Sequence, residues 1–135
     1  MQFSYFVGVD ISKDTLDAAL YPAKDRQKDF LHFDNTKKGL GEMMAWLKTL
    51  GVKRSDLLIC AEYTGVYTNT LIEFAERKGI ALSLNSPLDI KRSIGLVRGK
   101  NDAVDAARIA EFAYRRRENL RLYEKPCDAI MKMQY

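Results

Sequence analysis

Cysteine and histidine are scarce in this 135-residue chain, and no apolar run approaches the length of a membrane span. Cys60 and Cys127 lie far apart and form neither a CxxC motif nor a Cys/His pattern with metal-ligand spacing. Cys60 lies in an apolar segment and is expected to be a buried, reduced thiol. The N-terminus has no basic region followed by an apolar stretch and a cleavage site, so no signal peptide is predicted. These absences favour a cytoplasmic protein.

The excess of positive charge is small, and its distribution says more than its size. Lys and Arg number 22 against 18 Asp and Glu, for a net charge of +4 and a pI of about 9.1. Residues 91–125 hold ten basic and five acidic residues, so this tract alone supplies a surplus of five. Such a tract suits a phosphate-rich partner, and the alternative is a solvated helix face. The length and the 47% hydrophobic content indicate one globular domain.

Apolar periodicity predicts eight elements in the order β-β-β-α-β-α-β-α. The predicted strands are Phe3–Val9, Thr15–Tyr21, Lys28–Asp34, Asp56–Ala61 and Ile80–Leu84. The predicted helices run from a cap at Asn35-Thr36 to Gly51, over Tyr67–Lys78 and over Asn101–Arg116. The connecting segment Leu88–Arg98 is expected to be a short helix or loop and is not counted among the eight. This order predicts an α/β fold: a mixed five-stranded sheet flanked by helices, with the first three strands as an antiparallel meander.

The last of these helices carries two acidic residues where apolar ones are expected. Asp102 and Asp105 are three residues apart and share a face with Ala106, Ile109 and Ala113. Carboxylates on the apolar side of a helix point into the protein, where an unpaired charge is costly. Basic side chains or a metal ion are therefore expected beside them.

Two further acids follow apolar, strand-like runs at the points where the chain turns. They are Asp10 and Glu62, and they meet in one crevice if the first and fourth strands are neighbours. Four carboxylates in one pocket require a counter-charge, and Mg²⁺ or Mn²⁺ prefers such oxygen ligands. Two such ions support phosphodiester cleavage, while the basic tract from Lys91 to Arg117 would bind a nucleic-acid backbone.

Each acid also has a local explanation that the sequence leaves open. Asp10 and Glu62 are compatible with turn or surface positions. Asp102 could favour the positive end of its helix, and Asp105 could pair with Arg108. The lone histidine, His32, has no visible ligand partner and is expected to serve packing at the surface or in the core.

Three stretches are similar to the signature stretches of the DEDD-type insertion-sequence transposases. They are residues 7–13 (VGVDISK), 61–67 (AEYTGVY) and 99–106 (GKNDAVDA). The resemblance extends from about Tyr5 to Tyr123, in the order and spacing of the family. It implies a RuvC-like domain of the ribonuclease H fold over residues 1–122, with 123–135 starting a helical linker to a C-terminal domain absent from this chain. That second domain supplies a catalytic serine in the family.

The resemblance also implies specific roles and partners. Asp10, Glu62, Asp102 and Asp105 would be the catalytic, metal-binding tetrad, with Mg²⁺ as the ion and Mn²⁺ as a substitute. The implied activity is cleavage and joining of DNA during movement of an insertion sequence, with a structured guide RNA and a homo-oligomer as partners. Residues expected to contact nucleic acid are Lys13, Lys91, Arg92, Arg98 and Lys100.

Two other functions compete with this interpretation. ATP-using kinases of the actin and sugar-kinase type also end their first strand in an Asp before a turn, but the Ile11-Ser12-Lys13 turn lacks the glycines that let backbone amides approach phosphates. A non-catalytic nucleic-acid-binding or oligomerisation module of the same fold would use the acids as partners for basic side chains. Binding that weakens with salt and ignores divalent ions would identify that module.

Overall fold

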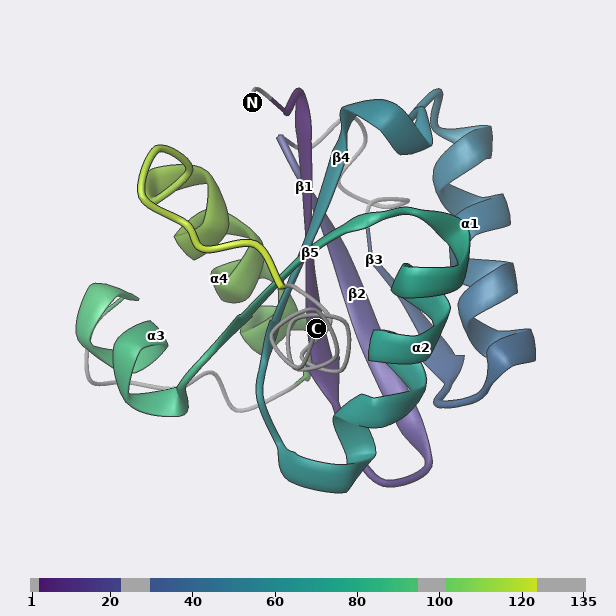
Figure 1. Ribbon diagram of the computed structural model, residues 1–135, viewed down its shortest axis with the longest axis horizontal. Coiled ribbons are helices and arrows are strands. Elements are labelled where there is room, and N and C mark those ends of the chain that lie inside the picture. The colour runs from purple at the N-terminus through teal and green to yellow at the C-terminus, as the bar shows by residue number, and fades with distance from the viewer. Residues whose placement is uncertain (1–2, 23–29, 95–101, 124–135) are drawn as a thin grey trace, which may run out of the picture.

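A computed structural model describes residues 3–22, 30–94 and 102–123, with side chains except at 91–94 and 102–104. Figure 1 shows a sheet with helices on either side of it. The elements are β1 (Tyr5–Ile11), β2 (Thr15–Tyr21), β3 (Phe30–Asp34), α1 (Lys37–Thr49), the 3₁₀ turn η1 (Arg54–Asp56), β4 (Leu57–Glu62), the 3₁₀ turn η2 (Gly65–Thr68), α2 (Asn69–Lys78), β5 (Ala81–Asn85), α3 (Pro87–Ile94) and α4 (Asp102–Arg115). Among the described residues no helix is both long and apolar enough to cross a membrane.

The strands form one mixed sheet in the order β3-β2-β1-β4-β5. Antiparallel pairing joins β1 to β2 and β2 to β3, while parallel pairing joins β1 to β4 and β4 to β5. The predicted meander, mixed sheet and element order are therefore confirmed. The two parallel connections each contain a helix, because a parallel crossover cannot be closed by a tight turn.

The ends of several elements differ from the sequence expectation. Strand β1 continues to Ile11 because Ser12 N–H bonds the carbonyl of Thr15 and closes the hairpin. Strand β4 includes Glu62, which pairs with Asn85 at the end of β5. Asp10 and Glu62, which were predicted to follow these strands, are therefore part of them. The expected helix or loop at 88–98 is a helix over Pro87–Ile94, and the extended stretch and helical tail predicted beyond residue 123 lie outside the described residues.

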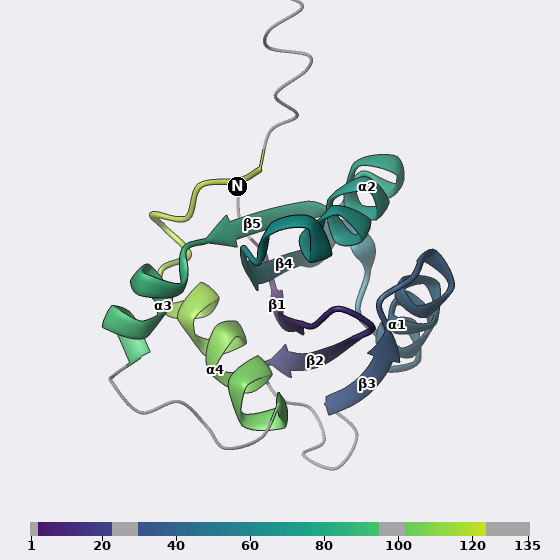
Figure 2. The same cartoon turned by 90° about the horizontal axis from the view of Figure 1, so that it is seen from below.

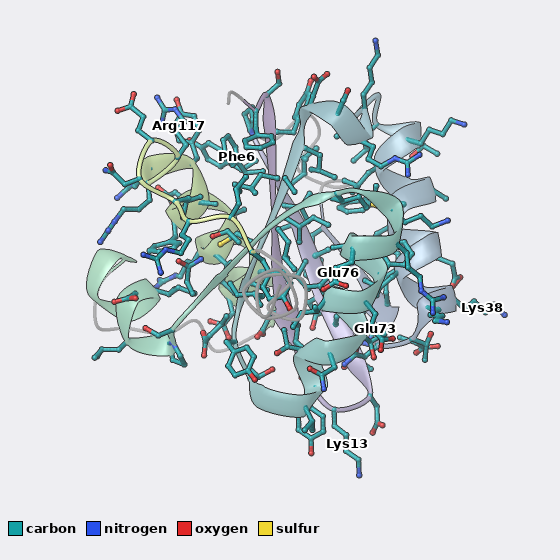
Figure 3. All side chains as sticks on the ribbon, viewed as in Figure 1. Phe6, Lys13, Lys38, Glu73, Glu76 and Arg117 are labelled. Atoms are coloured by element: carbon teal, nitrogen blue, oxygen red, sulfur yellow. The ribbon has the colours of Figure 1, made fainter. Side chains whose placement is uncertain are left out.

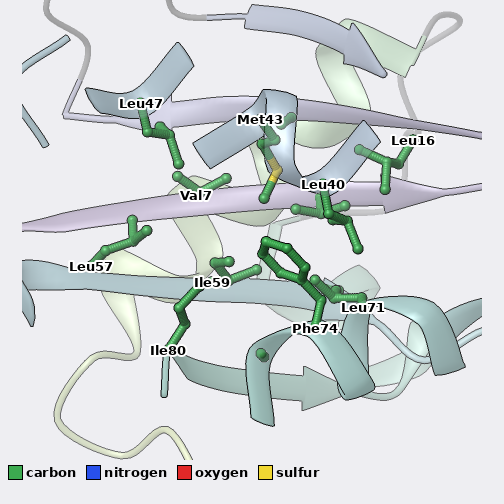
Figure 4. Close-up of a cluster of buried hydrophobic side chains, with 14 of the residues drawn as sticks. Val7, Leu16, Leu40, Met43, Leu47, Leu57, Ile59, Leu71, Phe74 and Ile80 are labelled. Carbon is green, nitrogen blue, oxygen red and sulfur yellow. The ribbon is translucent and has the colours of Figure 1, made fainter. Parts of the chain in front are cut away.

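The helices divide between the two faces of the sheet. Helices α1 and α2 cover one face, and α3 and α4 lie on the other (Figure 2). The larger core fills the α1/α2 face; its fully buried members include Val7, Ile59, Leu40, Met43 and Leu71 (Figure 4). Because neighbouring residues of a strand point to opposite faces, the intervening strand positions belong to the second core.

That second core lies under α4. It contains Phe6, Leu58 and Cys60 from the sheet and Ile109 and Phe112 from the helix. The predicted apolar face of this helix is confirmed, since Ala106, Ile109 and Ala113 are all buried. On the predicted polar side, Arg115 and Glu111 form an ion pair of 2.6 Å.

Glycine at position 8 lets α4 approach β1 closely. A Cβ added to Gly8 would collide with the backbone carbonyl of Ala106 and the backbone nitrogen of Ala110. Further along, the rings of Phe6 and Tyr114 meet edge to face with centroids 5.7 Å apart. The helix therefore runs antiparallel to β1, and its first turn approaches the carboxyl end of that strand.

Candidate metal site at the carboxyl end of the central strands

The structure makes the strands of Asp10 and Glu62 hydrogen-bonded neighbours. Their parallel register pairs Val9 with Ala61, so the next residue on each strand stands at the same level. Adjacent strands lie about 4.8 Å apart, which brings the two Cα atoms within one strand spacing. Both acids have the parity of residues that face α4, and both are half-buried. Two carboxylates therefore share one face at the same end of the sheet.

The same level of the sheet carries polar residues on every strand. Register pairs Glu62 with Asn85 on one side, and it pairs Asp10 with Asp17 and Asp17 with His32 on the other. We call these five residues, one from each strand, the polar row. It crosses the α4 face of the sheet, where the neighbouring positions on β1 and β4 are apolar or glycine.

Asp17 and His32 are joined directly, although sequence reasoning assigned neither to the site. His32 Nδ1 lies 2.7 Å from Asp17 Oδ1. The Asp17 residue is only 2% exposed, whereas the His32 side chain is 55% exposed. The packing role predicted for His32 missed this carboxylate partner. An acid between Leu16 and Ala18, in the middle of a strand whose other inner residues are apolar, was the available signal.

Asn85 anchors the other end of the polar row. Its Nδ2 donates to Ser83 Oγ at 3.1 Å and lies 3.3 Å from Cys60 Sγ. Burial raises the pKa of the Cys60 thiol from 9.0 to about 12, although the bond from Asn85 opposes this shift. The thiol therefore stays protonated near neutral pH and is a poor nucleophile. The buried, reduced thiol predicted from sequence is confirmed, since Cys60 is free and buried.

Helix α4 brings the second pair of predicted acids toward this end of the sheet. Asp102 is its first residue, and Asp105 is half-buried one position before the buried Ala106. Ala106 lies against Gly8, and Asp10 is the next residue of β1 on the same face. The side chain of Asp102 lies outside the described part of the structure.

The predicted nucleic-acid contacts are described only in part. Lys13 is exposed in the turn that connects β1 and β2, at the end of the sheet opposite Phe6 and Arg117 (Figure 3). Lys91 and Arg92 belong to α3, and nothing is described of their side chains. The remaining two, Arg98 and Lys100, lie outside the described residues.

The donor set present suits a hard divalent ion. Asp10 and Glu62 offer carboxylate oxygens at one level, and such oxygens are the ligands that Mg²⁺ and Mn²⁺ prefer. Among the side chains that the structure describes, no three Asp, Glu, His or Cys groups converge closely enough to hold a metal. The tetrad's fourth member, Asp102, is not among those side chains. The ion would thus need carboxylates from both the sheet and α4.

Comparison with known proteins agrees with this architecture. The model of a transposase family, the IS110-type DEDD transposases, matches residues 7–135. The fold is similar to that of Thermus thermophilus RuvC in complex with a Holliday junction substrate, with a TM-score of 0.55 and 12% identity over 88% of this chain and 99% of that chain. A second structure of Thermus thermophilus RuvC has a TM-score of 0.52 and 11% identity over the same shares of the two chains. No curated protein sequence matches the chain. The predicted RuvC-like, ribonuclease H-like fold is confirmed.

Proposed function

Because this chain belongs to the IS110-type DEDD transposase family, we propose that it is the metal-binding nuclease domain with which such a transposase cleaves and joins DNA. The proposal assigns Asp10, Glu62, Asp102 and Asp105 as the ligands of Mg²⁺, with Mn²⁺ as a substitute. One observation supports it above the others. The fold makes neighbours of two strands far apart in sequence, and each carries an acid at the same level beneath the helix that carries the other two.

Each residue of the proposed tetrad has a task that follows from its position. Asp10 and Glu62 are held by strands whose backbone hydrogen bonds leave little freedom, so their oxygens form a fixed platform. Asp105 belongs to a helix seated on β1 through the close contact at Gly8. A divalent ion held by these carboxylates would supply activation of the attacking oxygen and charge stabilisation of the leaving oxygen of a phosphodiester. The chain's own contribution is to fix these carboxylates and to hold DNA above them.

The proposed partner is nucleic acid. Lys13 is exposed at the carboxyl end of β1, and we assign it, with Lys91, Arg92, Arg98 and Lys100, to contacts with the phosphate backbone. The RuvC structure bound to a junction is of a protein with the same fold. The proposed assembly also includes a structured guide RNA and further copies of the same chain. Within each chain we place the end of the RuvC-like domain at residue 122, and we assign a catalytic serine to a separate domain.

Thermal melting with divalent ions tests the metal site directly. Carboxylates that repel one another in the ion-free protein predict stabilisation by Mg²⁺ or Mn²⁺, by about 2.7 kcal/mol at an ion concentration 100 times the dissociation constant. Glu62→Gln and Asp10→Asn should remove most of this response. Glu73→Gln is the matched control, because Glu73 is exposed on α2 at the other face of the sheet and should leave the response intact (Figure 3).

The outcomes separate the two functions that remain. An unmodified chain that shows no melting response to millimolar ion would contradict the metal site. If that chain still bound DNA or RNA with an affinity that fell steeply with salt, it would be the non-catalytic nucleic-acid-binding module.

A further inference from the structure

Asp17 is a buried acid immediately beside a proposed metal ligand. It is 2% exposed, and antiparallel pairing places it opposite Asp10 on the α4 face of the sheet. The bond from Ser12 N–H to the Thr15 carbonyl shows that the Asp10–Asp17 pair, two residues further along each strand, is a hydrogen-bonded pair. The Cα atoms of such a pair are about 5.5 Å apart. Two acidic residues thus stand opposite one another on the same face of the sheet.

The opposite neighbour of Asp17 hydrogen-bonds its carboxylate. His32 is its partner on β3 and contributes Nδ1 at 2.7 Å from Oδ1. The bond from Asn35 N–H to the Asp14 carbonyl makes the Asp17–His32 pair a non-hydrogen-bonded one, in which cross-strand side chains stand closer. The histidine therefore holds the carboxylate from the edge of the sheet, on the side away from Asp10.

Pairing between β1 and β2 does not by itself require two acidic residues opposite one another. Like charges directly opposite one another on a sheet are destabilising, and an apolar residue at position 17 would remove both the repulsion and the cost of burying a carboxylate. On the same face of the sheet, the next residue of β2 is Ala19, which is apolar and buried. The acid thus has an electrostatic cost at a place where the fold alone would favour an apolar side chain.

We propose that Asp17 is a positioning residue of the metal site: its negative charge raises the affinity of the Asp10 site for a divalent cation, and His32 holds it in place. This inference rests on the proposed function, since it gives Asp17 a role only if Asp10 binds metal. Outer partners of metal ligands change metal affinity by about 10- to 100-fold when they are removed. Asp17 acts in this way through its charge, which the His32 bond stabilises in the ion-free protein.

Two substitutions with opposite expected effects on the Mn²⁺ response test the roles of Asp17 and His32. Asp17→Asn keeps the shape and an acceptor for His32 but removes the charge, so the Mn²⁺ concentration at half-saturation should rise at least tenfold while the ion-free protein melts no lower than the unmodified chain. His32→Val removes the donor, so the Asp17 carboxylate loses the hydrogen bond that stabilises it in the ion-free protein. The ion-free protein should then melt lower, and the Mn²⁺-induced rise in Tm should be larger than in the unmodified chain.

Two further variants separate a positioning role from a structural one. His32→Asn retains an amide donor near the position of Nδ1, so this variant should melt and bind Mn²⁺ like the unmodified chain. Asp56→Asn makes the same chemical change as Asp17→Asn, but Asp56 lies just before β4, at the opposite end of the sheet, and should not change the Mn²⁺ affinity. Titration calorimetry with Mn²⁺ and thermal melting with and without the ion measure these effects.

The results distinguish an error in the proposed role of Asp17 from an error in the proposed metal site. If the unmodified chain binds Mn²⁺ and Asp17→Asn binds it equally well, Asp17 has no positioning role although the metal site stands. If Asp17→Asn melts lower without a change in Mn²⁺ affinity, the pair serves only to hold β3 on β2. An unmodified chain that does not bind Mn²⁺ overturns the proposed function and this inference with it.

Discussion

Replacing Gly8 by alanine tests how closely the helix with the acidic residues is seated on the sheet. The new Cβ would overlap the backbone of α4 at both Ala106 and Ala110. These are backbone atoms in the middle of a helix, so no side-chain rotation relieves the overlap and the helix as a whole must shift. Forcing an extra methyl group into a well-packed core costs about 1–3 kcal/mol. At roughly 4 °C per kcal/mol for a chain of this size, Tm should fall by about 4–12 °C.

The same shift should weaken the proposed metal site. Asp105 moves with α4 while Asp10 stays on β1, so the melting response of the Gly8→Ala variant to Mn²⁺ should shrink as well. Gly41→Ala is the control, because Gly41 is exposed on α1 and nothing lies within 4 Å of an added Cβ. There, alanine should stabilise by about 0.5–1 kcal/mol through its higher helix propensity.

Circular dichroism melting of both variants, with and without Mn²⁺, measures these effects. The expected result is a change in Tm of opposite sign in the two proteins, with the Mn²⁺ response reduced only in the first. A Gly8→Ala protein that melts within about 1 °C of the unmodified chain would refute the close approach of α4 to β1.

Two other substitutions address the fold around the site. Thr36 Oγ1 accepts a bond from the backbone N–H of Gly39 at 2.9 Å and caps α1, so Thr36→Ala should lower the free energy of unfolding by about 1 kcal/mol in urea titrations, whereas Thr36→Ser should retain most of it. For Cys60, the pKa of about 12 in the folded protein exceeds the ordinary value of 9.0, so the unfolded chain loses its thiol proton first and stability should fall as pH rises from about 9 to 12. Urea titrations of Cys127→Ser with and without Cys60→Ala should isolate this slope, and equal slopes would contradict the burial of the ionisable thiol.

Local patterns were enough to predict most of the fold. The strand at Thr15–Tyr21 was predicted with its observed bounds. The helix predicted to follow a cap at Asn35-Thr36 is α1, and Thr36 is its N-cap. Helix α2 ends at Lys78, and the next residue, Gly79, has the left-handed conformation expected after a helix, with φ of 65°. Such features depend on a few consecutive residues and their spacing, so the sequence carries them directly.

Pairing between distant segments was decided by the tertiary structure. Sequence placed Asp10 and Glu62 at strand ends, but only the parallel pairing of β1 with β4 brings them level. The Asp17–His32 contact and the role of Gly8 were missed, because both depend on which strand or helix lies opposite. A strand's own sequence records its two faces but not its neighbours, since register is set by cross-strand and helix packing. The sequence by itself therefore determined the candidate acids and their elements, and the order of strands in the sheet decided which of them stand together.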